Sequence, residues 1–121
     1  MLVTDAPLLY RQLKRLAKRA IVGLARVGGK SYNGSGYIVL AFSTAYRIPH
    51  YGREKMEVDV LRDSLLDPFF LAGAEATEEA IIGSLFISET MIGRDNRQVD
   101  AVPREYVIEF LRSRNALSSR S

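Results

Sequence analysis

The spacing of apolar positions changes several times along the chain, and each spacing predicts an element. From Tyr37 to Phe42 every residue is apolar or aromatic, which is typical of a strand buried on both faces. A strand of this kind needs helices above and below it, so we expect it to be central in a sheet. Met56, Val58 and Val60 alternate with acidic residues, which predicts a second, half-exposed strand.

Three other segments carry apolar residues three or four positions apart, the spacing of an amphipathic helix. The first begins at about Ala6, after the N-cap residue Asp5, and ends at Gly28-Gly29. The second runs from Pro68 to Thr90, and the third begins at Pro103. The chain therefore predicts an α/β (α+β) fold in which helices pack on a central sheet.

Length and composition are those of one globular domain. Of the 121 residues, 47% are hydrophobic and 26% charged, and we expect a single domain over residues 1–114 with a disordered Ser- and Arg-rich tail at 115–121. Cysteine is absent, and no run approaches the roughly 18 apolar residues of a membrane span. We expect a cytoplasmic protein with no membrane partner.

The net charge of +3 is unevenly placed, because cations gather on one face of the first helix: Arg11, Lys14, Arg15, Lys18 and Arg19. Clustered cations can bind nucleic acid. Helices also solvate one face with basic residues as a rule, and no aromatic is interleaved here for base stacking. Nucleic-acid binding is therefore the least favoured of the functions considered.

Candidate chemistry is sparse. His50 is the only histidine, and no spaced carboxylates frame it, so we predict neither a metal site nor a cofactor. The turn Asn33-Gly34-Ser35-Gly36 places a hydroxyl between two residues that can adopt positive φ. It is either a plain structural turn or a site that presents Ser35 at the start of a strand.

Six blocks of sequence add a resemblance. They are Thr4-Asp5-Ala6-Pro7-Leu8-Leu9, Gln12-Leu13-Lys14-Arg15-Leu16-Ala17, Ser35-Gly36, Leu40-Ala41-Phe42-Ser43-Thr44-Ala45, Glu75-Ala76-Thr77-Glu78-Glu79-Ala80-Ile81 with Ser84-Leu85, and Glu89-Thr90-Met91 with Gly93-Arg94-Asp95. In this order they resemble the carboxy-terminal part of the L-aminopeptidase/D-esterase family, the self-cleaving enzymes that include the β-peptidyl aminopeptidases. The resemblance extends to about Leu111.

This resemblance implies part of a layered α-β-β-α sandwich like that of the N-terminal-nucleophile hydrolases. Family precursors cut themselves into a long α chain and a short β chain, whose new N-terminal serine attacks the substrate while its own amine acts as base. The implied substrates are small peptides and amino-acid amides or esters, with no cofactor. The implied partners are an α-subunit-like chain and further copies of the αβ unit.

Two positions depart from the family pattern. The family's nucleophilic serine precedes the position of Thr4 by several residues, so we expect it upstream of Met1 and expect the chain alone to be inactive. Ser35 matches the family's second serine, whereas Tyr37 stands at the position of an acidic residue, and a phenol is neutral at pH 7. Ser35 and Tyr37 are the candidate catalytic residues. Asn96 replaces an expected glycine, and asparagine tolerates similar turn angles.

Two readings of the same fold remain open. The chain is the β-subunit-like part of an aminopeptidase, or it is a non-catalytic assembly or regulatory module that pairs with a separate α-like chain.

Overall fold

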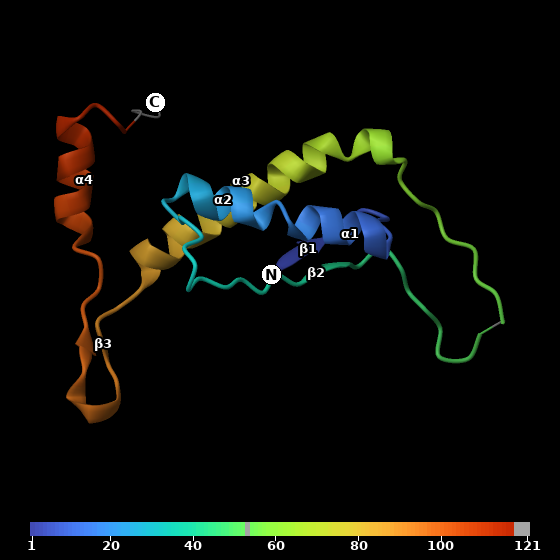
Figure 1. Ribbon diagram of the computed structural model, residues 1–121, viewed down its shortest axis with the longest axis horizontal. Coiled ribbons are helices and arrows are strands. Elements are labelled where there is room, and N and C mark those ends of the chain that lie inside the picture. Colours follow the sequence, from blue (N-terminus) through green and yellow to red (C-terminus); the bar gives the residue numbers. More distant parts are fainter. Residues whose placement is uncertain (53, 118–121) are drawn as a thin grey trace. The chain divides into compact units, whose positions relative to one another are not determined.

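The computed structural model describes residues 1–52 and 54–117, which form two compact units, one over Met1–Ile81 and one that begins at Ile82 (Figure 1). Residues 118–121 of the expected disordered tail lie outside the described residues. Within the described ranges, no helix is long and apolar enough to cross a membrane.

The first unit holds a parallel pair of short strands, β1 (Leu2–Thr4) and β2 (Ala41–Ser43). The strand that was predicted for residues 37–42 is therefore wrong in its bounds, because regular pairing begins only at Ala41. Burial on both faces is also wrong, since Ile38 is 102% exposed and Phe42 39% exposed. Residues of α2 and α3 lie beside residues 37–39 and line a cavity with them.

The single helix predicted from Ala6 is instead two helices, α1 (Tyr10–Ala17) and α2 (Ala20–Arg26). The turn before α1 is held by other bonds: the Ala6 N–H donates to Thr4 Oγ1 at 3.1 Å, so Asp5 does not cap a helix. At the break, the Arg19 N–H bonds to the Leu16 carbonyl three residues back, which tightens the last turn of α1. The predicted stop is confirmed, because Gly28 has φ +94°.

The long helix α3 (Asp67–Ile87) confirms the predicted start at Asp67-Pro68 and ends three residues before the predicted Thr90. A 3₁₀ turn, η1 (Asp63–Leu65), precedes it. Two glycines let α3 lie close to the first two helices. An added Cβ at Gly73 would lie 2.8 Å from Leu16 Cδ1, and an added Cβ at Gly23 would lie 2.3 Å from the Ala74 carbonyl oxygen. The core is small and consists of Ala6, Leu8, Leu16 and Leu66, with Leu2, Leu13, Leu61, Phe69 and Phe70 packed against it.

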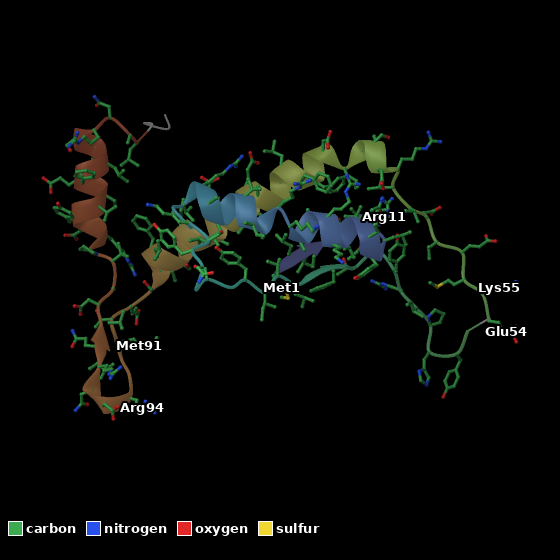
Figure 2. The ribbon with its side chains drawn as sticks, viewed as in Figure 1. Met1, Arg11, Glu54, Lys55, Met91 and Arg94 are labelled. Atoms are coloured by element: carbon green, nitrogen blue, oxygen red, sulfur yellow. The ribbon has the colours of Figure 1, made fainter. Side chains whose placement is uncertain are left out.

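The second strand predicted around Met56–Val60 is wrong. The segment between β2 and η1 is a long loop without a strand in its described residues, and Glu54 and Lys55 lie at its outer bend (Figure 2). Met56, Val58 and Val60 are exposed like the acidic residues Glu57 and Asp59 between them. Alternation alone did not make a strand because the described chain offers this segment neither a pairing strand nor a covering layer.

The second unit contains an antiparallel hairpin, β3 (Met91–Ile92) and β4 (Gln98–Val99), which no pattern in the sequence predicted. The polar turn predicted at Gly93–Asn96 joins these strands and includes the 3₁₀ turn η2 (Arg94–Asn96). Asn96 has φ +56°, a left-handed conformation that suits the residue standing in place of a glycine. The final helix, α4 (Arg104–Ser113), follows Pro103 as predicted.

Candidate active site

Ser35 lies in the exposed loop that leads into β2. Its backbone N–H donates to the Tyr32 carbonyl at 2.7 Å, which closes a four-residue turn. Neither flanking glycine uses positive φ, since Gly28 is the glycine with that conformation among the described residues. The turn is therefore held by a hydrogen bond, and its exposed serine hydroxyl remains open to the surroundings.

Tyr37 lies two residues after Ser35, where the loop joins the segment that leads into β2. Its hydroxyl donates to Ser31 Oγ, and its side chain is 39% exposed. Ser31 was not singled out in the sequence, and it has φ +46°, an uncommon conformation for a residue other than glycine. The Gly28-Gly29 pair shortly before it was the available signal that the chain turns sharply here.

A cavity of about 240 Å³ opens beside Tyr37. Apolar side chains dominate its lining: Met1, Leu2, Ala20, Ile21, Leu24, Tyr37, Ile38, Val39, Thr77 and Ile81. It is bounded by the start of β1, the segment before β2, and helices α2 and α3. Met1 lies at the start of β1 beside the segment that leads into β2 (Figure 2).

The register of the strands fixes what lies beside the Tyr37 segment. Leu2 pairs with Ala41, and the Leu2 N–H donates to the Leu40 carbonyl at 2.8 Å. Exposure alternates without a break through the unpaired residues before β2: Val39 is half-buried, whereas Ile38 and Leu40 are 102% and 59% exposed. Residues 38–40 thus show the alternating exposure of a strand, although regular pairing begins only at Ala41.

The other residues singled out in the sequence do not join this site. The His50 ring packs edge-on against Tyr51, with ring centroids 4.6 Å apart. Residues 1–52 and 54–117 hold no group of three His, Cys, Asp or Glu side chains that could bind a metal ion.

On the basic face that begins in α1, Arg11, Arg15 and Arg19 contact other side chains of the chain, yet the Arg11 side chain is still 70% exposed. Arg11 and Arg15 form ion pairs with Asp63 at 2.6 and 3.1 Å, and Arg11 is visible at the start of α1 in Figure 2. The guanidinium groups of Arg15 and Arg19 lie over the Phe70 ring. These contacts leave less of the face for a polyanion than the sequence implied.

Asp63 is the ionisable residue with the clearest electrostatic perturbation. A hydrogen bond from the buried Gln12 amide, at 2.9 Å, and one from Arg11 hold the pKa of Asp63 below its ordinary value of 3.8. The same Gln12 amide donates to the Leu61 carbonyl at 2.7 Å, and its oxygen accepts the Leu9 N–H at 3.0 Å. This cluster fixes the end of the long loop to α1 and is structural.

Known proteins are similar to this chain in sequence. Residues 1–99 match the model of peptidase family S58. The chain is 35% identical to beta-peptidyl aminopeptidase BapA of Sphingosinicella xenopeptidilytica and 37% identical to BapA of Sphingosinicella microcystinivorans. These matches cover 94% and 98% of the chain but only 29% and 30% of the relatives, so the chain spans less than a third of their length.

Three solved structures are similar to this chain in both sequence and fold. The chain is 55% identical to a Pyrococcus horikoshii protein, with a TM-score of 0.86 over 95% of this chain and 33% of the other. A Burkholderia beta-aminopeptidase is 37% identical, with a TM-score of 0.78, and the match covers 92% of this chain and 34% of the other. The L-aminopeptidase D-Ala-esterase/amidase of Ochrobactrum anthropi, whose structure is a variant of the Ntn hydrolase fold, is 36% identical. Its TM-score is 0.83, and the match covers 96% of this chain and 34% of the other. The resemblance and the fold class are confirmed, and the chain belongs to peptidase family S58.

Proposed function

We propose that this chain is the β-subunit-like part of an aminopeptidase that hydrolyses N-terminal amino acids from peptides, amides or esters. One observation carries the proposal: nearly the whole chain matches beta-peptidyl aminopeptidases, yet it corresponds to less than a third of their length. The remaining length is supplied by an α-subunit-like chain. A cytoplasmic location and assembly of several αβ units belong to the same proposal.

The nucleophile of this enzyme is a serine that precedes Met1 in a longer polypeptide. The β1–β2 register supports its placement, because residues that extended β1 backwards would run beside Val39, Ile38 and Tyr37 in turn. A serine a few residues further upstream would then lie near Ser35. Its own α-amine, once neutral, takes the hydroxyl proton as the oxygen attacks the substrate carbonyl.

Ser35 is the second hydroxyl of the site, and Tyr37 stands where relatives are expected to carry an acid. The exposed Ser35 hydroxyl can donate a hydrogen bond to the oxygen that becomes negative during attack. Tyr37 cannot offset the charge of a protonated amine in the way a carboxylate would. A less strongly protonated amine is a better base near neutral pH, so the substitution is compatible with activity.

The proposal assigns the docking of the α-like chain to a set of exposed apolar residues. The outward face of the strand region carries Val3, Ile38 and Leu40, which are 53%, 102% and 59% exposed. Large exposed apolar surfaces are typical of interfaces, and these residues support the proposal in that way. In the proposed enzyme the α-like chain forms the layer that covers it.

The test is a joined precursor that contains an α portion from a relative, an upstream Gly-Ser junction and this chain. We expect self-cleavage at the junction and release of the N-terminal amino acid from amino-acid p-nitroanilides. Replacing the junction serine with alanine should abolish both, and Ser35→Ala should lower the rate of release. Release by the chain alone, at a rate abolished by Ser35→Ala, would overturn the proposal.

The non-catalytic module makes a different prediction in the same experiment. Its motivating observation is Tyr37 at the acidic position. A joined precursor that assembles but stays inactive, and that gains activity only with Tyr37→Glu, would favour this alternative. Activity without that substitution would exclude it.

A further inference from the structure

The loop that carries Ser35 is closed by a side-chain hydrogen bond that the proposed chemistry does not itself use. The Tyr37 hydroxyl donates to Ser31 Oγ across six positions of sequence. Inside the loop, the Ser35 N–H donates to the Tyr32 carbonyl at 2.7 Å. The two bonds are nested, because the outer one joins the ends of the segment in which the inner one forms.

Packing does not hold this loop. An added Cβ at Gly34 or at Gly36 would meet nothing within 4 Å. Ser31 has φ +46°, a conformation that an L-residue adopts only when its surroundings impose it. Hydrogen bonds at Ser31 and Ser35 therefore have to define the loop, and the bond from Tyr37 is the one that acts on the strained residue.

Tyr37 is suited to this task because it also lines the apolar cavity. Val39, Ala20 of α2 and Ile81 of α3 line the same cavity. Its backbone leads directly into β2 through the alternating segment. The residue thus joins the start of the loop to both the helices and the strand.

We propose that Tyr37 is a positioning residue, whose hydrogen bond to Ser31 fixes the loop so that Ser35 is held near the reacting group. This role rests on the proposed function. An ionised carboxylate at this position has no hydrogen to donate, so it could only accept a bond from the Ser31 hydroxyl and would bring a negative charge into the loop. The tyrosine therefore supplies a neutral structural contact where the family pattern supplies charge.

The first test uses the chain as it is and measures amide hydrogen exchange at Ser35 by NMR. Tyr37→Phe keeps the ring and removes the donor, and we expect exchange at Ser35 to rise about fivefold, the worth of one exposed hydrogen bond. Ser31→Ala should have the same effect. Ser31→Asn, unlike Ser31→Ala, should keep exchange at the Ser35 amide slow, since asparagine tolerates positive φ and offers an acceptor.

Tyr46→Phe is the matched control. The Tyr46 hydroxyl donates to the Asp59 carbonyl at 2.9 Å in a different loop, so the same chemical change there should leave exchange at Ser35 unchanged. Unchanged exchange in Tyr37→Phe, or an equal rise in Tyr46→Phe, would overturn the assignment.

The second test measures steady-state kinetics in the joined precursor. Tyr37→Phe should lower kcat about fivefold with KM unchanged, because a displaced Ser35 affects the transition state more than substrate binding. Tyr46→Phe should change neither. If the precursor with Tyr37 is itself inactive, the proposed function fails, and hydrogen exchange alone decides whether Tyr37 holds the loop. An active precursor whose kcat is unaffected by Tyr37→Phe would overturn the positioning role.

Discussion

Replacing Gly23 with alanine should force α2 and α3 apart. At this position an added Cβ would lie 2.3 Å from the Ala74 carbonyl oxygen and 2.8 Å from Thr77 Cβ, and contacts under 3.0 Å are essentially never observed. The first obstacle is backbone of a long helix, which cannot rotate out of the way as the end of a side chain can. The two helices must therefore separate, which loosens the packing between them.

The expected loss of stability follows from two opposing effects. Overpacking a tight contact costs up to about 3 kcal/mol when the neighbour cannot yield. Alanine in a helix interior is about 1 kcal/mol more favourable than glycine, which offsets part of this cost. We expect Gly23→Ala to lower the free energy of unfolding by about 2 kcal/mol.

Urea unfolding followed by circular dichroism measures the effect, and two other helix glycines serve as controls. At Gly73 the nearest atom to an added Cβ is Leu16 Cδ1, at 2.8 Å, the end of a flexible side chain that can move. Gly73→Ala should therefore be close to neutral. At Gly83 nothing lies within 4 Å, so Gly83→Ala should stabilise by up to about 1 kcal/mol. Equal stability of Gly23→Ala and wild type would refute this account of the helix contact.

Three further predictions concern single residues. Gln12→Leu leaves the Leu9 N–H and the Leu61 carbonyl without their partner, and should lower the free energy of unfolding by about 2 kcal/mol in the same urea assay. The pKa of Asp63 is lowered in the folded protein, so its ionised form contributes stability that is fully present above pH 3.8 and is lost as pH falls through the lower folded pKa. Asp63→Asn should therefore make the free energy of unfolding less dependent on pH in that range, as measured by acid unfolding. Asn96→Gly should be neutral and Asn96→Val destabilising by about 1 kcal/mol on thermal unfolding, because position 96 has φ +56°.

Helix ends were predicted correctly at positions where one residue type has a specific effect on the backbone. Gly28 ends α2 with positive φ, Asp67-Pro68 opens α3, and Pro103 precedes α4. Each of these follows from local backbone chemistry and needs no tertiary partner. The break between α1 and α2 was not predictable in this way, because its apolar spacing continues smoothly from Leu16 to Ala20.

The strands were predicted less well because strands depend on neighbours. Apolar residues from Tyr37 to Phe42 indicated burial, yet Ile38 and Leu40 are exposed in this chain. In the proposed enzyme the α-like chain would cover these residues, and the proposal accounts for their apolar character in this way. The hairpin β3–β4 was missed because its strands have two residues each, too few for a periodic signal.

The candidate site was predictable only in part. The turn Asn33-Gly34-Ser35-Gly36 already marked Ser35 as a candidate, and the resemblance gave Ser35 and Tyr37 their expected roles, whereas the apolar run assigned Tyr37 to a buried strand. The bond from Tyr37 to Ser31 joins side chains six positions apart in an irregular loop, where no periodic rule applies. The Gln12–Asp63 bond spans 51 positions and likewise has no local signal.

The central claim is that this polypeptide is the β-subunit-like part of a working hydrolase. Native mass spectrometry with N-terminal sequencing, on protein isolated from its own organism, tests this claim most directly. We predict a complex with a second, longer chain and an N-terminal serine that lies upstream of Met1. A polypeptide that begins at Met1 and carries no partner would contradict the claim.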